Sequence, residues 1–351
     1  MKTLCIICQG VDEDSDVLGF FVDWIAEFSK NFDHVDVIAQ YVGKYNLPSN
    51  VSVYSLGKEK RRSKFKQLLA FYSLAWRLFP QSVGIFAHMS PIFVPMAWPV
   101  AVIRRKRIIL WYLHRSVTLR LKIALMLCYK IVTASKQSLP IKSPKIIETG
   151  HGINVSRFVT SRQPVLENST VNILSVGRIS RIKSFETLIG AVTVLKKRGI
   201  NFKLTIAGRP IMSGDFSYET DIKKQVAENH LADQVEFAGL VPYHFIPAYF
   251  RRAKIFVNLT PTGGVDKVVL EAMVAGCLPL VSNKVFEQYF GSNASQLIFE
   301  HGNVIDLASK LENLVSLTSY EMGVITRTML ETVRQYHGIE ATIKKISTLF
   351  T

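Results

Sequence analysis

The sequence predicts an α/β protein built from two doubly wound, parallel-sheet domains. Short apolar runs of strand length alternate with runs of helical period along most of the chain, which is the pattern of βαβ units. With 351 residues, the chain is too long for one ordinary core. We expect a first domain over residues 1–160, a second over 161–330, and a C-terminal helix over 331–351 that packs back on the first domain.

The first domain is expected to begin with a strand at Leu4–Cys8 and a helix at Gly19–Phe28. Further strands are expected at His34–Ala39, Val83–Ala87, Arg107–Tyr112 and Lys130–Thr133, with helical runs between them that include Lys64–Phe79. The uncharged stretch Ser82–Ile103 contains three prolines, which favour a buried strand followed by a helix over a membrane span.

After a linker at Asn154–Thr170, the alternation of strands and helices starts again. The second domain is expected to have strands at Val171–Val176, Lys203–Ala207, Gln234–Phe237, Ile255–Leu259 and Leu278–Ser282, and helices at Phe185–Lys197, Tyr218–Asn229 and Lys267–Ala275. Ligands of open parallel sheets bind at the carboxyl ends of the strands, so the residues just after each strand are candidates for a site. Two such domains facing each other would form one cleft.

Basic residues are concentrated in the first half of the chain. Residues 41–150 hold 19 Lys or Arg against only Glu59 and Glu148, a net charge of +17, whereas the rest of the chain sums to −1. Clusters at residues 58–66 and 104–107 adjoin apolar sequence and favour a peripheral contact with an anionic membrane surface; a solvated basic face is the alternative. No helix-turn-helix, zinc or aromatic-platform pattern supports nucleic acid as the partner.

The four cysteines are expected to be buried and structural. Cys5 and Cys8 have C-x-x-C spacing, but they lie in an apolar strand with no helix N-terminus to lower a thiol pKa. No disulfide framework is indicated, so we expect a cytoplasmic protein, with a peripheral position on the inner face of the cell membrane if the basic clusters bind lipid. The apolar run at the start of the sequence is too short for a signal peptide.

A cationic loop follows the first strand of the second domain. Gly177 permits a sharp exit from the strand, and Arg178 and Lys183 precede a helix whose N-terminus attracts anions. A guanidinium fork and an ammonium suit a diphosphate, and they would stabilise the charge that grows on it when it is a leaving group. A solvated basic loop is the alternative. No G-x-G-x-x-G follows the first strand of either half, which argues against a dinucleotide oxidoreductase.

The second half of the chain contains, in this order, the motifs ILSVGRISRIKSFETLIGA, LTIAG, VEFAGLVP and VVLEAMVAGCLPLVS. Earlier in the chain stand CQGVDEDSDVLGFFVDWI, FAHMSP, LWYLHR and TGHGINVSRF. By the first series, and more loosely by the second, the chain resembles glycosyltransferase family 4, the retaining, group 1-type glycosyl transferases of GT-B fold. The resemblance implies two facing Rossmann-like domains, of which the first binds the acceptor and the second binds a nucleotide-sugar donor. It also implies that no cofactor and no essential metal are needed.

The resemblance further implies roles for individual residues. Arg178 and Lys183 would bind the donor diphosphate, and His114 would contact the transferred sugar beside the reaction centre. Glu271 would hydrogen-bond the donor ribose, although a salt-bridged helix acid is the alternative for this buried carboxylate. The other residues expected at the donor are Gly19, Gly177, Ala238, Gly239, Leu240, Gly263, Gly264, Asp266 and Lys267.

On the acceptor side, the sequence offers a histidine and alternating acids. His88 ends a strand, where a structural role is the alternative, and Asp12 and Asp16 lie with Asp14 in the loop after the first strand. Metal ligation by the three acids is the less favoured hypothesis, against acceptor contact or a solvated loop.

One departure from the family pattern leaves the function open. The family has a second Glu eight positions before Glu271, and here that position is Gly263. Glycines let backbone N–H groups approach a sugar, and Asp266 would supply the missing carboxylate. The leading hypothesis is retaining transfer from a nucleotide-sugar to a glycan or lipid-linked saccharide in cell-envelope polysaccharide synthesis. A GT-B nucleotide-sugar epimerase and a non-catalytic nucleotide-sugar-binding protein are the alternatives.

Overall fold

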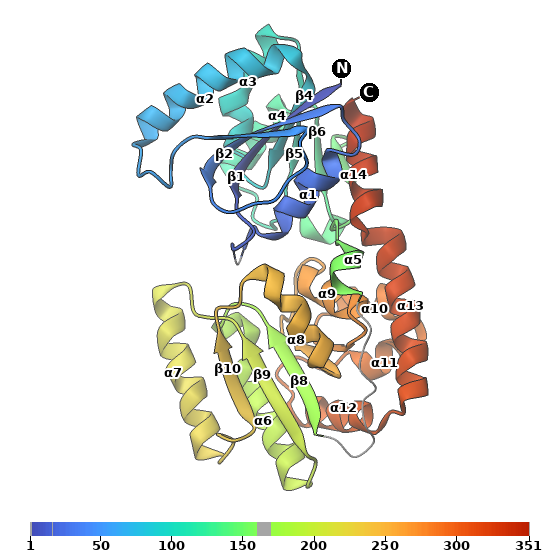
Figure 1. Cartoon of the computed structure of the whole chain (residues 1–351). Coiled ribbons are helices and arrows are strands. Elements are labelled where there is room, and N and C mark those ends of the chain that lie inside the picture. The colour runs from blue at the N-terminus through green and yellow to red at the C-terminus, as the bar shows by residue number, and fades with distance from the viewer. Residues whose placement is uncertain (1, 16, 160–169, 351) are drawn as a thin grey trace. The chain divides into compact units, whose positions relative to one another are not determined.

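The computed structural model describes residues 2–15, 17–159 and 170–350. They divide into two compact units, of which the first comprises Met1–Asn154, Pro242–His244 and Tyr336–Thr351, and the second comprises Val155–Val241 and Phe245–Gln335. Each unit is built on its own parallel sheet with helices around it (Figure 1). The predicted α/β class with two parallel sheets is therefore confirmed.

The first unit contains a seven-stranded parallel sheet in the order β3-β2-β1-β4-β5-β6-β7. Its strands are β1 (Thr3–Val11), β2 (His34–Val42), β3 (Val51–Ser55), β4 (Ser82–His88), β5 (Arg107–Trp111), β6 (Lys130–Thr133) and β7 (Ile146–Glu148). In the centre, Ile6 of β1 pairs with Val37 of β2 and Phe86 of β4. The two strands that the sequence did not predict, β3 and β7, are the two edges of this sheet.

Helices cover both faces of this sheet. The helices α2 (Lys64–Leu78), α3 (Phe93–Ile103) and α4 (Leu119–Leu127) share one apolar core with Cys5 and Ile7 of β1. The helices α1 (Phe20–Phe28) and α14 (Ile339–Ser347) share another with Leu4 and Ile6, which point to the opposite face because side chains alternate along a strand.

The uncharged stretch Ser82–Ile103 forms β4 and α3, as its prolines predicted. Across the described part of the chain, no helix combines the length and the hydrophobicity that crossing a bilayer requires.

The C-terminal segment is not one helix over residues 331–351. The helix α13 (Ser319–His337) ends before Gly338, whose extended backbone (φ −61°, ψ 144°) separates it from α14. Ile343 and Ile346 of α14, with Phe350 beyond it, are buried in the core that contains α1. The last residues of the chain thus complete one face of the first unit (Figure 1).

All four cysteines are buried and free. Burial raises the pKa of the Cys8 thiol to about 12 and that of Cys128 to about 11, and it also raises the pKa of Cys5. Thiols that stay protonated do not act as nucleophiles or metal ligands, so the structural interpretation of the C-x-x-C pair is supported.

The second unit contains a five-stranded parallel sheet in the order β10-β9-β8-β11-β12. Its strands are β8 (Val171–Val176), β9 (Phe202–Ala207), β10 (Val235–Gly239), β11 (Ile255–Asn258) and β12 (Leu278–Val281). Its helices are α5 (Val155–Phe158), α6 (Phe185–Lys197), α7 (Ser213–Glu228), α8 (Ile246–Arg252), α9 (Lys267–Val274), α10 (Glu287–Phe290), α11 (Ala294–Leu297) and α12 (Val304–Ser316), together with most of α13. The expected linker at Asn154–Thr170 begins with α5, and its residues 160–169 lie outside the described part of the chain.

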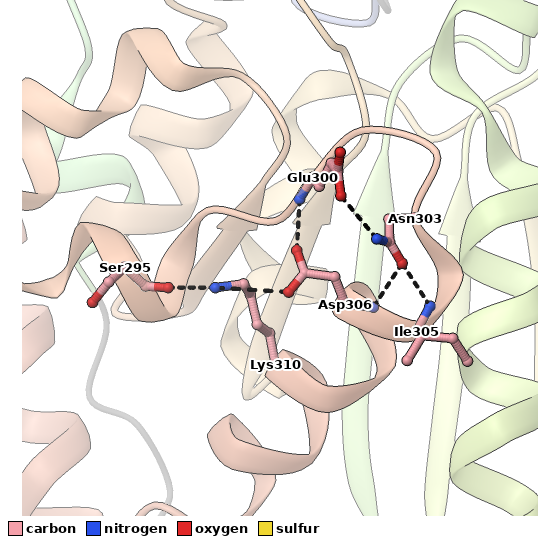
Figure 2. A network of polar contacts seen from close by, with 6 residues as sticks. All are labelled: Ser295, Glu300, Asn303, Ile305, Asp306 and Lys310. Atoms are coloured by element: carbon pink, nitrogen blue, oxygen red, sulfur yellow. Dashed lines mark hydrogen bonds and ion pairs between the residues drawn. The ribbon is translucent and has the colours of Figure 1, made fainter.

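A polar network fixes the start of α12, which packs on α6 (Figure 2). The side-chain oxygen of Asn303 accepts the N–H groups of Ile305 and Asp306 at 3.1 and 3.0 Å, which satisfies two amides of the first turn. The Asp306 carboxylate in turn accepts the Glu300 N–H at 2.7 Å, and the Asn303 amide donates to Glu300 at 2.8 Å. Lys310 reaches the Ser295 carbonyl and ties the helix to α11.

His88, the last residue of β4, lies inside the apolar core of the first unit. Its ring stacks on Phe21 with centroids 3.7 Å apart and lies 6.0 Å from the ring of Trp24. Burial lowers the pKa of His88 to about 3, so the imidazole is neutral near pH 7. Within the described residues, its Nε2 has no hydrogen-bond partner.

We expect the Asn303→Ala variant to unfold with a free energy lower by about 1 kcal/mol, because two amides of α12 lose their acceptor. Urea denaturation monitored by circular dichroism measures the change. Asn313→Ala, at an exposed position inside the same helix, is the matched control and should leave stability unchanged within about 0.5 kcal/mol. Equal losses in the two variants would contradict the capping role.

The buried His88 makes stability depend on pH. Its pKa is lower in the folded than in the unfolded protein, so its contribution is complete above the unfolded pKa near 6.5 and is lost as the pH falls toward about 3. Between pH 7 and pH 5, we expect a loss of about 2 kcal/mol from this group. The difference between wild type and His88→Asn, measured by urea denaturation at both pH values, isolates it; an equal loss in the variant would show that His88 is not responsible.

Candidate functional site

Three glycines lie at the carboxyl ends of three neighbouring strands in the second unit. Gly177 follows β8, Gly208 follows β9, and Gly239 ends β10. The Gly177 N–H donates to Ala207 at 2.9 Å, and the Gly208 N–H donates to Gly239 at 2.8 Å. A Cβ atom on Gly208 would lie 1.9 Å from the Gly177 carbonyl oxygen, so no side chain fits there. At the carboxyl ends of these three strands, the glycine positions therefore present backbone without side chains; we call this the bare edge of the sheet.

The side chain of Lys183 folds back over this edge. A Cβ atom on Gly177 would be 3.6 Å from Cε and 3.7 Å from Nζ of Lys183, although six positions separate the two residues in the sequence. Arg178, the residue after Gly177, is partly exposed at the same strand end. The structure therefore brings together Gly177, Arg178 and Lys183 at the carboxyl end of β8.

Each of the two cations has a carboxylate nearby. Lys183 Nζ lies 3.6 Å from Asp266 Oδ2, and Arg178 Nε lies 3.8 Å from Asp215 Oδ2. Both separations are longer than a hydrogen bond, and pairs of this kind at partly exposed sites contribute at most about 1 kcal/mol. The two cations are thus held in place loosely enough for a stronger anion to replace the carboxylates.

The first amide of α6, the helix that follows Lys183 as the sequence predicted, already has a partner within the protein. At the start of α6, the Phe185 N–H donates to the Tyr218 hydroxyl at 2.6 Å, and that hydroxyl donates to Glu186. Ser184, in the left-handed region at φ 42°, separates the Lys183 turn from this helix. Lys183 also approaches Asp266, the residue before the first turn of α9. The positive end of the α9 dipole therefore lies near Lys183.

Asp266 is positioned from the neighbouring strand. Asn258, the last residue of β11, donates from Nδ2 to Asp266 Oδ2 at 3.0 Å. Asn258 was not a sequence-predicted site residue; the signal was a polar residue at the end of the apolar run IFVN. Asp215, near Arg178, and Tyr218, which covers the start of α6, were also missed, because both come from α7 and no local pattern relates them to the cationic loop.

Glu271 is buried on α9, one turn after Lys267, and the two side chains form an ion pair. The geometry thus contains the salt bridge that the alternative interpretation required. The ribose contact of Glu271 and the donor contact of Lys267 both stay predictions. Lys267 and Glu271, both expected at the donor, are therefore paired with each other.

Gly263, which stands where the family pattern has a Glu, has a backbone conformation that favours glycine. Gly263 has φ 137°, which side-chain-bearing residues rarely adopt, and a Cβ atom there would meet no atom within 4 Å. A Glu side chain would therefore have room, but the loop would have to change its conformation to accept one. The carbonyl of Gly264 accepts a hydrogen bond from Asn283 at 3.4 Å, which ties the loop to the end of β12.

The loop expected beside the base starts at the end of β10. Ala238 and Gly239 belong to this strand, and Leu240 follows it with its side chain exposed. An exposed leucine next to a bare strand end is an apolar surface, which suits the face of a base. The base contact stays a prediction.

The candidates in the first unit have local roles of their own. A Cβ atom on Gly19 would lie 2.6 Å from the Ser15 carbonyl, so the loop itself requires glycine at this position. Asp12 Oδ1 accepts the N–H groups of Asp14 and Lys44, both at 3.2 Å. These contacts give Gly19 and Asp12 structural functions whether or not they also meet a ligand.

The remaining acids and histidines of the first unit are dispersed. Asp16 lies outside the described residues, and Asp14 is 3.5 Å from Lys44 and from His244. Among the described residues, no group of three or more His, Cys, Asp or Glu side chains is placed to hold a metal ion.

His114 is exposed in the loop after β5, three residues beyond the strand end, with its ring 5.4 Å from that of Tyr112. His88, by contrast, is in the core. Their sugar and acceptor contacts stay predictions.

Comparison with known proteins shows similarity to glycosyltransferases. Residues 158–327 match the family model described as glycosyl transferases group 1. The chain is 24% identical over 222 residues to a putative colanic acid biosynthesis glycosyltransferase of Escherichia coli, covering 61% of this chain and 52% of the relative. It is 33% identical over 146 residues to an amylovoran biosynthesis glycosyltransferase of Erwinia amylovora, covering 40% of this chain and 34% of the relative. The chain thus spans about half or less of these relatives.

Solved structures share the fold over the whole chain. The Anabaena protein HepE, crystallised with UDP and glucose, superposes with a TM-score of 0.73 at 15% identity and covers 99% of both chains. At this identity, the likeness shows the fold alone, which is the GT-B type with two Rossmann-like units. Residues 158–327, slightly less than half of the chain, are thus similar to the glycosyl transferases group 1 family.

Proposed function

We propose that this chain transfers a sugar, with retention of configuration, from a nucleotide-sugar donor to a saccharide or lipid-linked acceptor in polysaccharide synthesis. The observation that carries the proposal is the folding of Lys183 over Gly177 beside Arg178, at a strand end stripped of side chains. Support also comes from relatives named for colanic acid and amylovoran biosynthesis.

The chemistry of transfer explains why cations belong at this place. When the bond from the sugar to the diphosphate breaks, its electron pair stays on the departing diphosphate and adds one negative charge. Arg178 and Lys183 would stabilise that charge more strongly than the charge of the bound donor, so they would lower the barrier as well as bind the donor. The positive end of the α9 dipole would act in the same direction.

The sugar would lie toward the loop of Gly263 and Gly264. The space beside Gly263 is open, and Asp266 stands at the beginning of α9, next to Lys183. We assign to Asp266 the role of the carboxylate that contacts the transferred sugar. Once the diphosphate pairs with Lys183 in place of Asp266, the Asp266 carboxylate can accept a hydrogen bond from a hydroxyl group of the sugar.

The acceptor would bind to the first unit. Its basic stretches at residues 58–66 and 104–107 suit an acceptor that is held at an anionic membrane surface. The nucleotide is to be identified by thermal stabilisation with UDP-, GDP- and ADP-sugars. Incubation with the stabilising donor alone then tests the alternatives: a new sugar without an acceptor indicates an epimerase, and binding without turnover indicates a non-catalytic protein.

We expect Lys183→Ala to reduce the rate of transfer by roughly 30- to 150-fold, equivalent to ~2–3 kcal/mol of lost transition-state stabilisation. Arg181→Ala is the matched control. Arg181 belongs to the same turn, but it is paired with Asp221 at 3.6 Å and stacks over Tyr218, so its removal should change the rate by less than about threefold. Steady-state kinetics with the identified donor measure both, and unchanged turnover in Lys183→Ala would refute the role of the cation pair.

Asp266→Asn should separate diphosphate binding from transfer. Removing the negative charge beside Lys183 should leave the affinity for the free nucleoside diphosphate unchanged or raise it by up to about fivefold. The rate of transfer should fall by more than about tenfold, because a carboxylate that contacts the sugar is lost. Asp215→Asn, which removes the charge beside Arg178, should change the affinity for the nucleoside diphosphate to a similar extent, but it should not reduce the rate of transfer. Calorimetry and kinetics together measure the split, and parallel behaviour of the two variants would contradict the sugar contact.

A further inference from the structure

The outer surface of α3 in the first unit is apolar although it is exposed. The helix has no charged residue in its sequence FVPMAWPVAVI. Its inner side, with Phe93, Val94 and Ala97, is buried against the sheet. On its outer side, Trp98 and Val102 are exposed, and Ile103 is 62% exposed. A helix that is apolar all round is expected inside a protein or in contact with lipid, and α3 lies in the outer layer of its unit.

The two neighbouring helices extend this surface. Helix α3 packs against both α2 and α4, and all three cover the same face of the sheet (Figure 1). On α2, exposed Phe65, Leu69 and Trp76 recur at i, i+4 and i+11, which places them on one stripe apart from the buried Phe71. On α4, Leu119 and Met126 are 73% and 77% exposed, seven residues apart on one side. We name the outer surface of these three helices the α2–α4 face.

The charge around the α2–α4 face has a single sign. From residue 60 to residue 147 the chain has no Asp or Glu, so the surface of these helices carries no negative side chain. Basic side chains lie beside its aromatic residues: the Arg104 guanidinium lies 5.0 Å from the ring centre of Trp76, and that of Arg107 lies 4.5 Å from that of Tyr129. Ordinary protein surfaces mix both signs, and they rarely combine an extended apolar patch with one sign of charge.

We propose that the α2–α4 face inserts its apolar side chains into an anionic lipid bilayer. Insertion of apolar side chains and attraction to acidic headgroups are the two contributions that stable interfacial binding requires, and this face supplies both. Aliphatic side chains at its centre match acyl chains rather than nucleic-acid bases. A second copy of the chain would place one acid-free surface against another, and like charges would repel across that interface. The proposal deepens the membrane contact of the proposed function and requires no sugar transfer.

The tryptophans provide a direct test of insertion. Trp76 and Trp98 are partly exposed on the α2–α4 face, whereas Trp24 and Trp111 are buried in the core. With the full chain and vesicles of phosphatidylglycerol and brominated phosphatidylcholine, we expect a blue shift of tryptophan emission and quenching by the brominated acyl chains. Vesicles of brominated phosphatidylcholine alone should produce at least tenfold less quenching at equal lipid, because the basic groups then meet no acidic headgroup.

A pair of matched variants isolates the apolar contribution. Leu119→Ser with Met126→Ser should weaken partition into the phosphatidylglycerol vesicles by roughly tenfold or more at physiological salt, with no change in the melting temperature, because both side chains are exposed. Ile305→Ser with Val324→Ser, at side chains 60% and 53% exposed in the second unit, is the control and should bind as wild type does. Flotation of the vesicles measures partition.

The outcomes distinguish the proposal from its rivals. Binding that is abolished by high salt and shows no quenching would mean adsorption by charge alone and would overturn insertion. Absence of binding at low salt would overturn any membrane role of this face and would favour an acidic protein partner. The measurements contain no donor or acceptor, so failure of the sugar-transfer assays would leave them unaffected, and failure here would leave the donor site untouched.

Discussion

The close approach of two backbones, at Gly177 and Gly208, keeps side chains out of the candidate site of the second unit. Because the Gly177 carbonyl oxygen occupies the place of a Cβ on Gly208, β8 and β9 end side by side without side chains between them. The bare edge leaves room for the Lys183 side chain to return over Gly177. A larger residue after β9 would clash with the Gly177 carbonyl, and one after β8 would need a φ of 140°, which side-chain-bearing residues rarely adopt. Both strand ends therefore favour glycine, and Lys183 lies over them with the Asp266 carboxylate 3.6 Å from its ammonium group.

Charge is arranged differently in the two units. In the second unit, Arg178 and Lys183 each have a carboxylate 3.6–3.8 Å away, so under the proposed function a diphosphate would exchange one anion for another instead of filling an unpaired positive site. Such exchange favours a ligand with two adjacent negative groups over a single carboxylate. In the first unit, the long acid-free segment leaves the basic residues without local compensation. The proposed anion site of the second unit thus depends on local geometry, whereas the positive charge of the first unit acts at a distance.

Much of this arrangement was predictable from sequence, because strand ends carry the candidate site and strands are visible as apolar runs. Gly177, Arg178 and Lys183 could be placed together from the run that ends at Val176. The partners Asp215 and Tyr218 could not, because α7 reaches the loop only through the packing of helices on the sheet. The edge strands β3 and β7 were missed for another reason. Val51–Ser55 is only half buried, and Ile146–Glu148 is three residues long, so neither has an apolar run of its own.

On α2, α3 and α4, the inner residues serve the fold, whereas the outer residues do not. Their inner residues, such as Phe71, Ala97 and Leu121, are fixed by the sheet that they cover, and any chain with this fold needs apolar groups there. Their outer residues are under no such demand, since substitutions at exposed positions change stability by only about 0.5 kcal/mol. Apolar side chains at Ile103, Leu119 and Met126 therefore do not serve the core, and in water they increase the tendency to aggregate. A surface that costs solubility and adds no stability is explained by a partner that covers it, and the absence of acidic residues around it makes an acidic lipid surface the partner that fits both properties.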